Sequence, residues 1–155
     1  RTVTGVQTCA LPNLVQRRED VLGGKSFGTA GPYEKIYGRV YFAVDPSAPR
    51  NQIIVDVDKA PRNAQGRVEF SSDIFIIKPK DSSRGNGVVL IDVVNRGNFA
   101  LLRTFSRANG PADPKVEADY GDAYLLQQGF TLVGVGLIVQ FWMHLAEFIR
   151  KRKAA

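Results

Sequence analysis

Polar residues that could do chemistry follow the most apolar stretch of the chain. Residues 88–94 contain six Val, Leu or Ile residues out of seven, and Asn95, Arg96, Gly97 and Asn98 come directly after them. In an open α/β sheet, ligands bind outside the carboxyl ends of the strands. A polar loop with a glycine can turn backbone N–H groups there toward an anion or a developing oxyanion. Residues 95–98 are therefore our candidate site; the alternative is a strand-to-loop turn with Gly97 at positive φ and Arg96 in a surface ion pair.

Three glycine motifs partly match known signatures. Gly24-Lys-Ser-Phe-Gly28 matches G-x-S-x-G, in which a strand-to-helix turn presents a nucleophilic serine. We expect no such role for Ser26, because no strand signal precedes it and residues 29–32 cannot continue as a helix. The same stretch lacks the first P-loop glycine, because Glu19 occupies that position. Gly134-Val-Gly136 has two of the three glycines of a dinucleotide fingerprint and is more simply a strand end, so we expect no cofactor.

Metal and thiol chemistry lack the residues that they need. The chain has one cysteine, Cys9, and one histidine, His144, which excludes an internal disulfide, a zinc or iron–sulfur site and a Cys–His nucleophile pair. Two carboxylate pairs could serve acid–base chemistry or a hard cation, although an edge strand and a solvated helix start explain them as well: Asp56 with Asp58, and Asp113 with Glu117. We expect no metal site, and we expect His144 to be solvated.

The positive charge is concentrated at the chain ends. The formal net charge is +6, yet residues 14–136 hold 16 basic and 14 acidic residues, and the surplus comes from Arg1 and residues 150–153. A nucleic-acid partner is therefore not expected. An apolar content of 44% with 10% aromatic residues excludes disorder over most of the chain, and 155 residues suffice for one domain or for part of a larger one.

Strand patterns predict a mixed sheet. Residues 39–44, 52–58 and 67–78 have the β-branched and aromatic composition of strands and are separated by turn residues, which predicts an antiparallel meander. Residues 14–37 have neither a strand nor a helix period and are predicted to form an irregular lead-in.

The second half predicts a βαβ unit. Residues 88–94 are apolar on both faces, which is typical of a strand in a sheet covered by helices on both sides. A helix is expected over 116–128, ended by Gly129, and a second buried strand over 130–135. Such crossovers join parallel strands and are right-handed, so the fold class is α/β, with 88–94 and 130–135 adjacent and parallel.

Both chain ends have unusual sequences. Residues 1–13 resemble a sequencing-adapter oligonucleotide translated in frame, and we interpret them as a non-native leader that packs against nothing; a natural strand or the end of a signal peptide are the alternatives. Residues 137–155 form a basic tail in which an amphipathic helix is favoured over a membrane span. Its apolar residues lie at helical spacing: Ile138, Phe141, Trp142, Leu145, Phe148 and Ile149.

Several sequence blocks together resemble the amino-terminal part of the bacterial "alpha/beta hydrolase domain" proteins. They lie in order between Ser26 and Gly136: residues 26–34, 38–46, 51–56, 60–63, 66–70, 92–98 and 125–130. The resemblance implies a partial α/β-hydrolase sheet, in which 88–94 corresponds to the third strand and the following loop lends a backbone N–H to the oxyanion hole. The serine, acid and histidine of the family would lie further along, and nothing in this sequence matches them.

The sequence departs from the family pattern after Gly136, as a reading-frame slip or an assembly join near that residue would produce. We expect residues 14–136 to be the amino-terminal piece of an ester or acyl-bond hydrolase that acts on a small molecule, not catalytic by itself. The alternative is a small α/β binding module held to a membrane surface by its tail. The cellular compartment is not indicated by the sequence.

Overall fold

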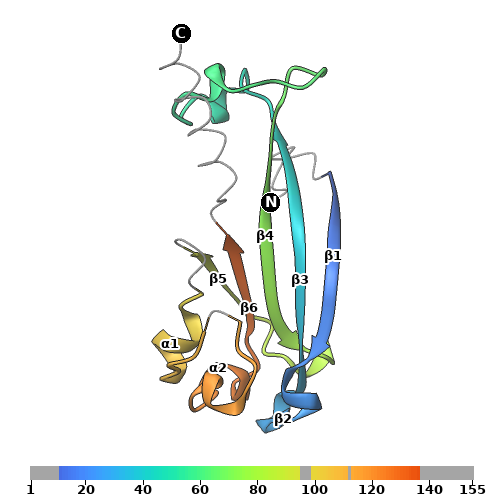
Figure 1. Ribbon diagram of the computed structural model, residues 1–155, viewed down its shortest axis with the longest axis vertical. Helices are drawn as coiled ribbons and strands as arrows, with labels where there is room; N and C mark the ends of the chain where they lie inside the picture. Colours follow the sequence, from blue (N-terminus) through green and yellow to red (C-terminus); the bar gives the residue numbers. More distant parts are fainter. Residues whose placement is uncertain (1–10, 95–98, 112, 137–155) are drawn as a thin grey trace.

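Six strands and several short helices make up the described part of the protein. The computed structural model describes residues 11–94, 99–111 and 113–136 (Figure 1). The strands are β1 (Leu11–Asp20), β2 (Ser26–Phe27), β3 (Gly31–Val44), β4 (Val68–Pro79), β5 (Val89–Val94) and β6 (Thr131–Gly136), and the α-helices are α1 (Leu101–Ser106) and α2 (Tyr124–Gln127). Short 3-10 turns lie at Val21–Gly24, Gly28–Ala30, Pro49–Asn51, Val57–Lys59, Ser82–Arg84 and Glu117–Tyr120. The sheet order is β1-β3-β4-β6-β5, and β2 pairs with the start of β3.

A long antiparallel pair, β3 with β4, is the centre of the sheet. Its register runs from Tyr33 opposite Pro79 to Val44 opposite Val68. Val, Ile and aromatic residues favour these strands, and Pro79 ends β4 because proline cannot donate a further ladder hydrogen bond. The strands predicted at 39–44 and 67–78 are present, but they pair directly with each other, whereas the predicted meander placed 52–58 between them.

The predicted βαβ unit is also confirmed. β5 and β6 are adjacent and parallel, with Val89 opposite Thr131 and Val94 opposite Gly136, and β6 pairs antiparallel with β4 on its other side. Parallel strands need a crossover, and residues 99–111 and 113–130 supply it with α1 and α2. The fold is therefore an α/β-type mixed sheet.

The strand predicted at 52–58 is wrong. The segment forms consecutive turns, in which Asn51 N donates to Ala48 O at 2.8 Å and Ile54 N donates to Asn51 O at 3.0 Å. Asp56 has a φ of 58°, in the left-handed region, which no strand residue adopts. The tertiary reason is that β1 and β4 occupy both edges of β3, so the segment cannot pair beside β3 as the predicted meander required.

The irregular lead-in predicted at 14–37 is also wrong, because β1 and the first half of β3 lie there. β1 pairs antiparallel with β3, with Leu11 opposite Tyr41 and Asp20 opposite Glu34, and two irregularities interrupt the register. Its alternating pattern is masked in the sequence because charged residues, Arg17 and Glu19, occupy the face that points toward the crossover. β1 begins at Leu11, which pairs with Tyr41, so the expectation that residues 1–13 pack against nothing is wrong for the described start of β1. Residues 1–10 lie outside the described residues, and the origin of the leader stays a prediction.

The helix predicted at 116–128 is interrupted. A 3-10 turn and α2 are separated at residues 121–123, where Gly121 and Ala123 have positive φ values of 59° and 52°. A Cβ atom on Gly121 would lie 1.8 Å from Ser106 O, and Asp122 N donates to that same oxygen at 2.9 Å. The break thus lets the chain dock closely on the end of α1. Gly129 ends α2 with a φ of 79°, as predicted.

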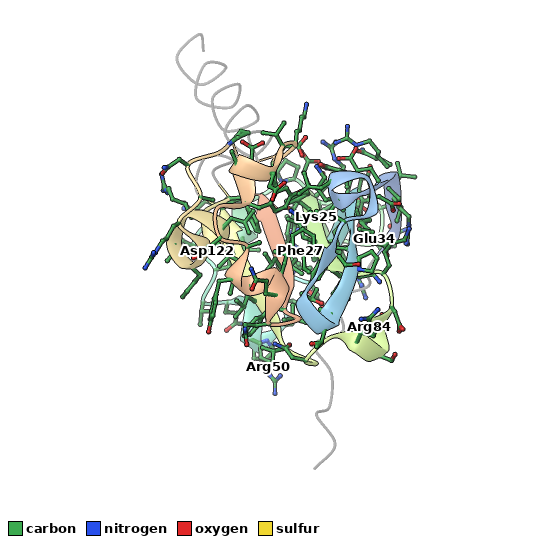
Figure 2. All side chains as sticks on the ribbon, turned by 90° about the horizontal axis from the view of Figure 1, so that it is seen from below. Lys25, Phe27, Glu34, Arg50, Arg84 and Asp122 are labelled. Atoms are coloured by element: carbon green, nitrogen blue, oxygen red, sulfur yellow. The ribbon has the colours of Figure 1, made fainter. Side chains whose placement is uncertain are left out.

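The helices cover one face of the sheet. The buried core contains Phe27, Tyr33, Ile77, Leu126 and Leu132. In Figure 2, Phe27 lies near the centre of the view, whereas Arg50 and Arg84 lie at its periphery. The Phe27 and Tyr33 rings meet edge to face at 5.6 Å. The expectation that helices cover both sides of 88–94 is wrong for the described residues, because alternate side chains of β5 are exposed.

Candidate functional site

The candidate loop leaves the sheet at the carboxyl end of β5. Asn95, Arg96, Gly97 and Asn98 themselves lie outside the described residues, but the chain on either side is placed. Val94 is buried at the end of β5, and the Asp92 carboxylate accepts a hydrogen bond from Ala100 N at 2.7 Å. This hydrogen bond therefore links the end of β5 to the residue directly before α1, so it joins the two chain segments between which the loop lies.

An aromatic residue packs where the chain leaves the loop. The Phe99 ring lies over Gly134 of β6, where a Cβ atom would come within 2.8 Å of the ring, and it meets the Phe75 ring edge to face at 5.3 Å. Gly134 thus has a packing role, which agrees with the interpretation of Gly134-Val-Gly136 as a strand end. Asp92 and Phe99 were not singled out from the sequence; the signal that could have identified Asp92 is a lone carboxylate inside an apolar strand.

The position of the loop suits anion or oxyanion binding. β5 and β6 are parallel and in register, so their carboxyl ends meet at one edge of the sheet. The Asp92–Ala100 hydrogen bond and the Phe99–Gly134 contact lie at that edge. A backbone N–H group held at such an edge can stabilise charge that develops in a transition state, because it needs little reorganisation when the reaction occurs.

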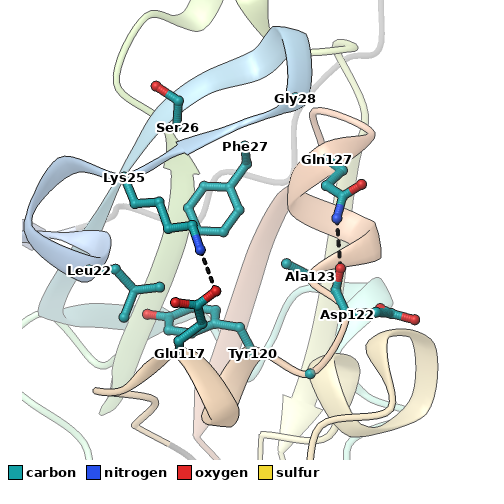
Figure 3. A pocket seen from close by; sticks show the side chains of 11 residues that line it. Leu22, Lys25, Ser26, Phe27, Gly28, Glu117, Tyr120, Asp122, Ala123 and Gln127 are labelled. Carbon is teal, nitrogen blue, oxygen red and sulfur yellow. Dashed lines mark hydrogen bonds and ion pairs between the residues drawn. The ribbon is translucent and has the colours of Figure 1, made fainter.

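The Gly24–Gly28 motif lies at the rim of a small cavity instead of forming a strand-to-helix turn. The cavity has a volume of about 160 Å³, and Figure 3 shows Phe27 and Tyr120 beside it while the Ser26 hydroxyl points away. Ser26 belongs to β2 and pairs with Pro32, and the short turn that follows is not a helix that could support a nucleophile. Among the described residues, no side chain forms a hydrogen bond with the Ser26 hydroxyl.

The polar groups of the cavity satisfy one another. Lys25 forms an ion pair with Glu117, and Gln127 Nε2 donates to Asp122 O at 2.7 Å. The cavity adjoins α2, which directly precedes β6, and therefore lies at the amino end of the parallel strands. This is opposite to the end at which α/β sheets bind ligands, so the cavity is a weaker candidate than the loop.

A cluster of charged residues that the sequence did not reveal joins β1, β3 and the crossover. The Lys35 ammonium, with a side chain that is 3% exposed, lies 2.6 Å from Glu19 Oε1 and 3.1 Å from Asp113 Oδ1, and it donates to Pro114 O at 2.6 Å. Tyr37 donates to Asp113, and the Arg17 guanidinium lies 3.8 Å from the centre of the Tyr37 ring. Each buried charge therefore has a partner of opposite sign, which is the arrangement that burial requires.

The pKa shifts in this cluster follow from its contacts. The hydrogen bond from Lys35 lowers the pKa of Glu19. Burial opposes ionisation of Asp113, but hydrogen bonds from Tyr37 and Lys35 outweigh it and hold its pKa below the usual value. Burial likewise opposes the charge on Lys35, but its two carboxylate partners raise its pKa. All three groups stay charged at neutral pH, so the cluster joins elements and offers no free acid or base.

Three carboxylates of the two pairs considered in the sequence bind lysine residues. Asp56 binds Lys59 at 2.6 Å on the surface. Asp113 faces Lys35, whereas Glu117 faces Lys25 at the cavity. Over residues 11–94, 99–111 and 113–136, no group of three or more His, Cys, Asp or Glu residues could hold a metal ion. His144 lies outside the described residues.

Comparison of the chain with protein-family models, with curated proteins and with solved structures gives no match. No helix in the described part of the chain is long and apolar enough to cross a membrane.

Proposed function

We propose that residues 14–136 are the amino-terminal part of an α/β-hydrolase domain that, when complete, cleaves an ester or related acyl bond of a small molecule. The observation that carries this proposal is the parallel β5–β6 pair beside an antiparallel strand, with a polar glycine loop at the carboxyl end of β5. The sequence blocks between Ser26 and Gly136 that resemble the hydrolase family support the same assignment.

In this proposal the loop at 95–98 supplies an oxyanion donor. A backbone N–H of the loop would face the tetrahedral intermediate, while the Asp92–Ala100 hydrogen bond and the Phe99–Gly134 contact fix the chain directly after the loop. Acyl transfer also needs a nucleophile beside a base that a third group orients. The described residues contain no histidine, and Ser26 points away from the cavity beside it, so these residues by themselves would not be catalytic.

The outer edge of β5 gives independent support. Within the described ranges, β5 pairs only with β6, which leaves its other edge without a partner strand. Parallel strands rich in Val and Ile are almost always covered on both faces, and natural proteins avoid long, exposed apolar edges. A sheet that continues beyond β5 in a larger domain would cover this edge.

The proposal predicts that the 155-residue chain lacks esterase activity. The purified chain should show no saturable hydrolysis of p-nitrophenyl acetate or butyrate and no covalent labelling by a fluorophosphonate, because no residue in the described part of the chain activates a serine. The Ser26→Ala variant is the matched control and should behave identically. Stoichiometric labelling that Ser26→Ala abolishes would overturn the proposal and make the Gly24–Gly28 motif an active site.

The proposed role of the loop in catalysis can be tested in a longer protein that contains these residues. In such an enzyme Gly97→Pro removes one N–H donor, so kcat should fall by roughly a hundredfold or more with little change in KM. The urea unfolding curve of the same variant controls for loss of folding. An unchanged kcat would show that the loop is only a turn.

The alternative, a small binding module complete in itself, makes the opposite prediction. If the surrounding DNA encodes no longer chain, and the 155-residue protein is monodisperse and unfolds cooperatively in urea, the fragment proposal is wrong.

A further inference from the structure

The face of the sheet opposite the helices is apolar and exposed at β5. Val89, Ile91 and Val93 point to this face, and they are 52%, 65% and 61% exposed. Their registered neighbours on β6 are Thr131, Val133 and Val135, which continue the same face toward β4. Three adjacent β-branched residues in solvent form a patch of the kind that another element usually covers.

Polar groups cover one end of this face. Arg18 Nη1 lies 3.2 Å from Glu34 Oε2, and Lys78 Nζ lies 3.0 Å from Glu34 Oε1, which places an ion-pair cluster over β1, β3 and the end of β4. Ile36, on the same face, is buried, whereas Phe70 of β4 is 41% exposed. The apolar side chains of β5 on this face are more exposed than Phe70 and lie at the edge of the sheet.

The sheet order determines which face the chain reaches after β6. β6 has β4 on one side and β5 on the other, so a further parallel strand can join only beyond β5. Such a connection crosses the sheet in the direction opposite to the β5-to-β6 crossover. Two right-handed crossovers that run in opposite directions lie on opposite faces. Because α1 and α2 occupy one face, a segment that led from β6 to such a strand would lie on the other face, where Val89, Ile91 and Val93 are exposed.

The sequence after β6 has the pattern that this position requires. Residues 138–149 lie outside the described residues, and their apolar side chains follow helical spacing while Gln140, His144 and Glu147 fall on a different face. Twelve helical residues span about 18 Å. Six strand residues span about 20 Å. One amphipathic helix of this length would therefore cover the whole of β5.

We propose that residues 138–149 pack their apolar stripe against the face of β5 and β6 that carries Val89, Ile91 and Val93. The choice of this face by crossover handedness rests on the proposed function, because it assumes that a strand follows beyond β5. The packing itself is a property of the 155-residue chain, so it can be tested without any hydrolase activity. The apolar stripe of the tail would then serve the fold, and would not be free to bind a membrane.

Trp142, the single tryptophan, reports this contact. Its fluorescence in the intact chain should be that of a buried indole and should be poorly quenched by acrylamide. Ile91→Asp should shift the emission to the red and raise quenching toward that of free tryptophan, because a carboxylate would face the apolar stripe. Ile53→Asp is the matched control, since Ile53 is 85% exposed in the turns between β3 and β4 and should leave the emission unchanged. Solvent-like emission in the intact chain, or emission that Ile91→Asp does not alter, would overturn the proposal.

A disulfide test covers the case in which Ile91→Asp fails to fold. In a Cys9→Ser background, Ile91→Cys with Leu145→Cys should form an intramolecular disulfide, whereas Ile53→Cys with Leu145→Cys should not. A disulfide that forms only between two chains would show that a second copy covers β5. Trp142 emission that shifts to the blue only with anionic lipid vesicles would show that the tail binds a membrane surface. Either result would overturn the proposal.

Discussion

Single residues place the candidate loop and join the crossover to the sheet. Gly134 has no side chain because the Phe99 ring occupies the space that a Cβ atom would need. The Tyr33 hydroxyl donates to Leu126 O at 2.9 Å and to Phe130 O at 3.2 Å, which fixes the chain between α2 and β6. Tyr33 therefore fixes the amino end of β6, whereas the Phe99–Gly134 contact lies toward its carboxyl end, where the candidate loop leaves β5.

Gly134→Ala should destabilise the protein by about 1–3 kcal/mol, because overpacking forces the Phe99 ring or the strand to move. Gly136→Ala is the control, since its Cβ would lie 3.6 Å from Asp73 O in ordinary contact. Urea unfolding of both variants measures the difference. A Gly134→Ala variant as stable as Gly136→Ala would mean that Phe99 does not hold this position.

Tyr33→Phe should cost about 1–3 kcal/mol, because two carbonyl oxygens lose their donor inside the protein. Tyr124→Phe changes the same group on a half-exposed side chain and should be close to neutral. Burial raises the pKa of Tyr33 to about 12. A raised tyrosine pKa stabilises the fold below the unfolded value, near 10, and this stability is lost as the pH rises toward 12. The alkaline loss of stability should therefore be smaller in Tyr33→Phe, as unfolding measured between pH 8 and pH 11 would show.

At the scale of elements, charged contacts decide where β1 and the crossover lie. β1 has charged residues on the face that points toward the crossover, and the buried Lys35 ammonium joins β1 to residues 113–114. An edge strand with inward-pointing charges is protected against pairing with other chains. The same charges conceal the strand from a search for alternating apolar residues.

Lys35→Met should destabilise the protein by about 2–4 kcal/mol, because it leaves Glu19 and Asp113 without their buried partner. Lys59→Met removes an exposed ion pair and should cost less than about 0.5 kcal/mol. Thermal unfolding of the two variants at pH 7 gives the comparison. Equal losses in the two variants would show that the cluster adds no stability.

The same cluster predicts an acid dependence. Glu19 and Asp113 have lowered pKa values in the fold, so their stabilisation is present above the unfolded pKa values, near 4, and is lost as the pH falls through the lower folded values. Asp113→Asn should be less stable than the parent at pH 7 and should lose less stability between pH 5 and pH 2. Parallel pH curves for the parent and Asp113→Asn would contradict this assignment.

At the scale of the whole molecule, the β3–β4 pair extends beyond the helices. Core residues such as Tyr33 and Ile77 lie at the end that α2 covers, whereas Ile53 and Val55, in the turns at the other end, are exposed (Figure 1). Local stability follows burial and contact density. The two ends of the pair should therefore open independently.

Hydrogen exchange tests this difference along the β3–β4 pair. Amides in residues 33–36 and 75–78 should exchange slowly, through global unfolding, whereas amides in residues 49–59 should exchange faster by several orders of magnitude, through local opening. Uniform protection from the core to the turns would show that another element packs on the exposed end.

The α/β class, the strands near 39–44 and 67–78, the parallel β5–β6 unit and the end of α2 at Gly129 could be predicted from the sequence, but the direct pairing of β3 with β4 could not. The predicted features depend on local composition and on a handedness rule that holds for any crossover. The sequence also placed the candidate loop at a strand end, although residues 95–98 lie outside the described residues.

Only the tertiary structure decided the rest. Residues 52–58 have the composition of a strand but form turns, because β1 and β4 occupy both edges of β3. Residues 11–20 lack that pattern but form a strand, because Lys35 and Asp113 neutralise the charges that β1 turns inward. Asp92 and Phe99 frame the loop through partners eight or more residues away. Strand pairing and charge burial depend on which neighbours are present in space, and a local pattern does not contain that information.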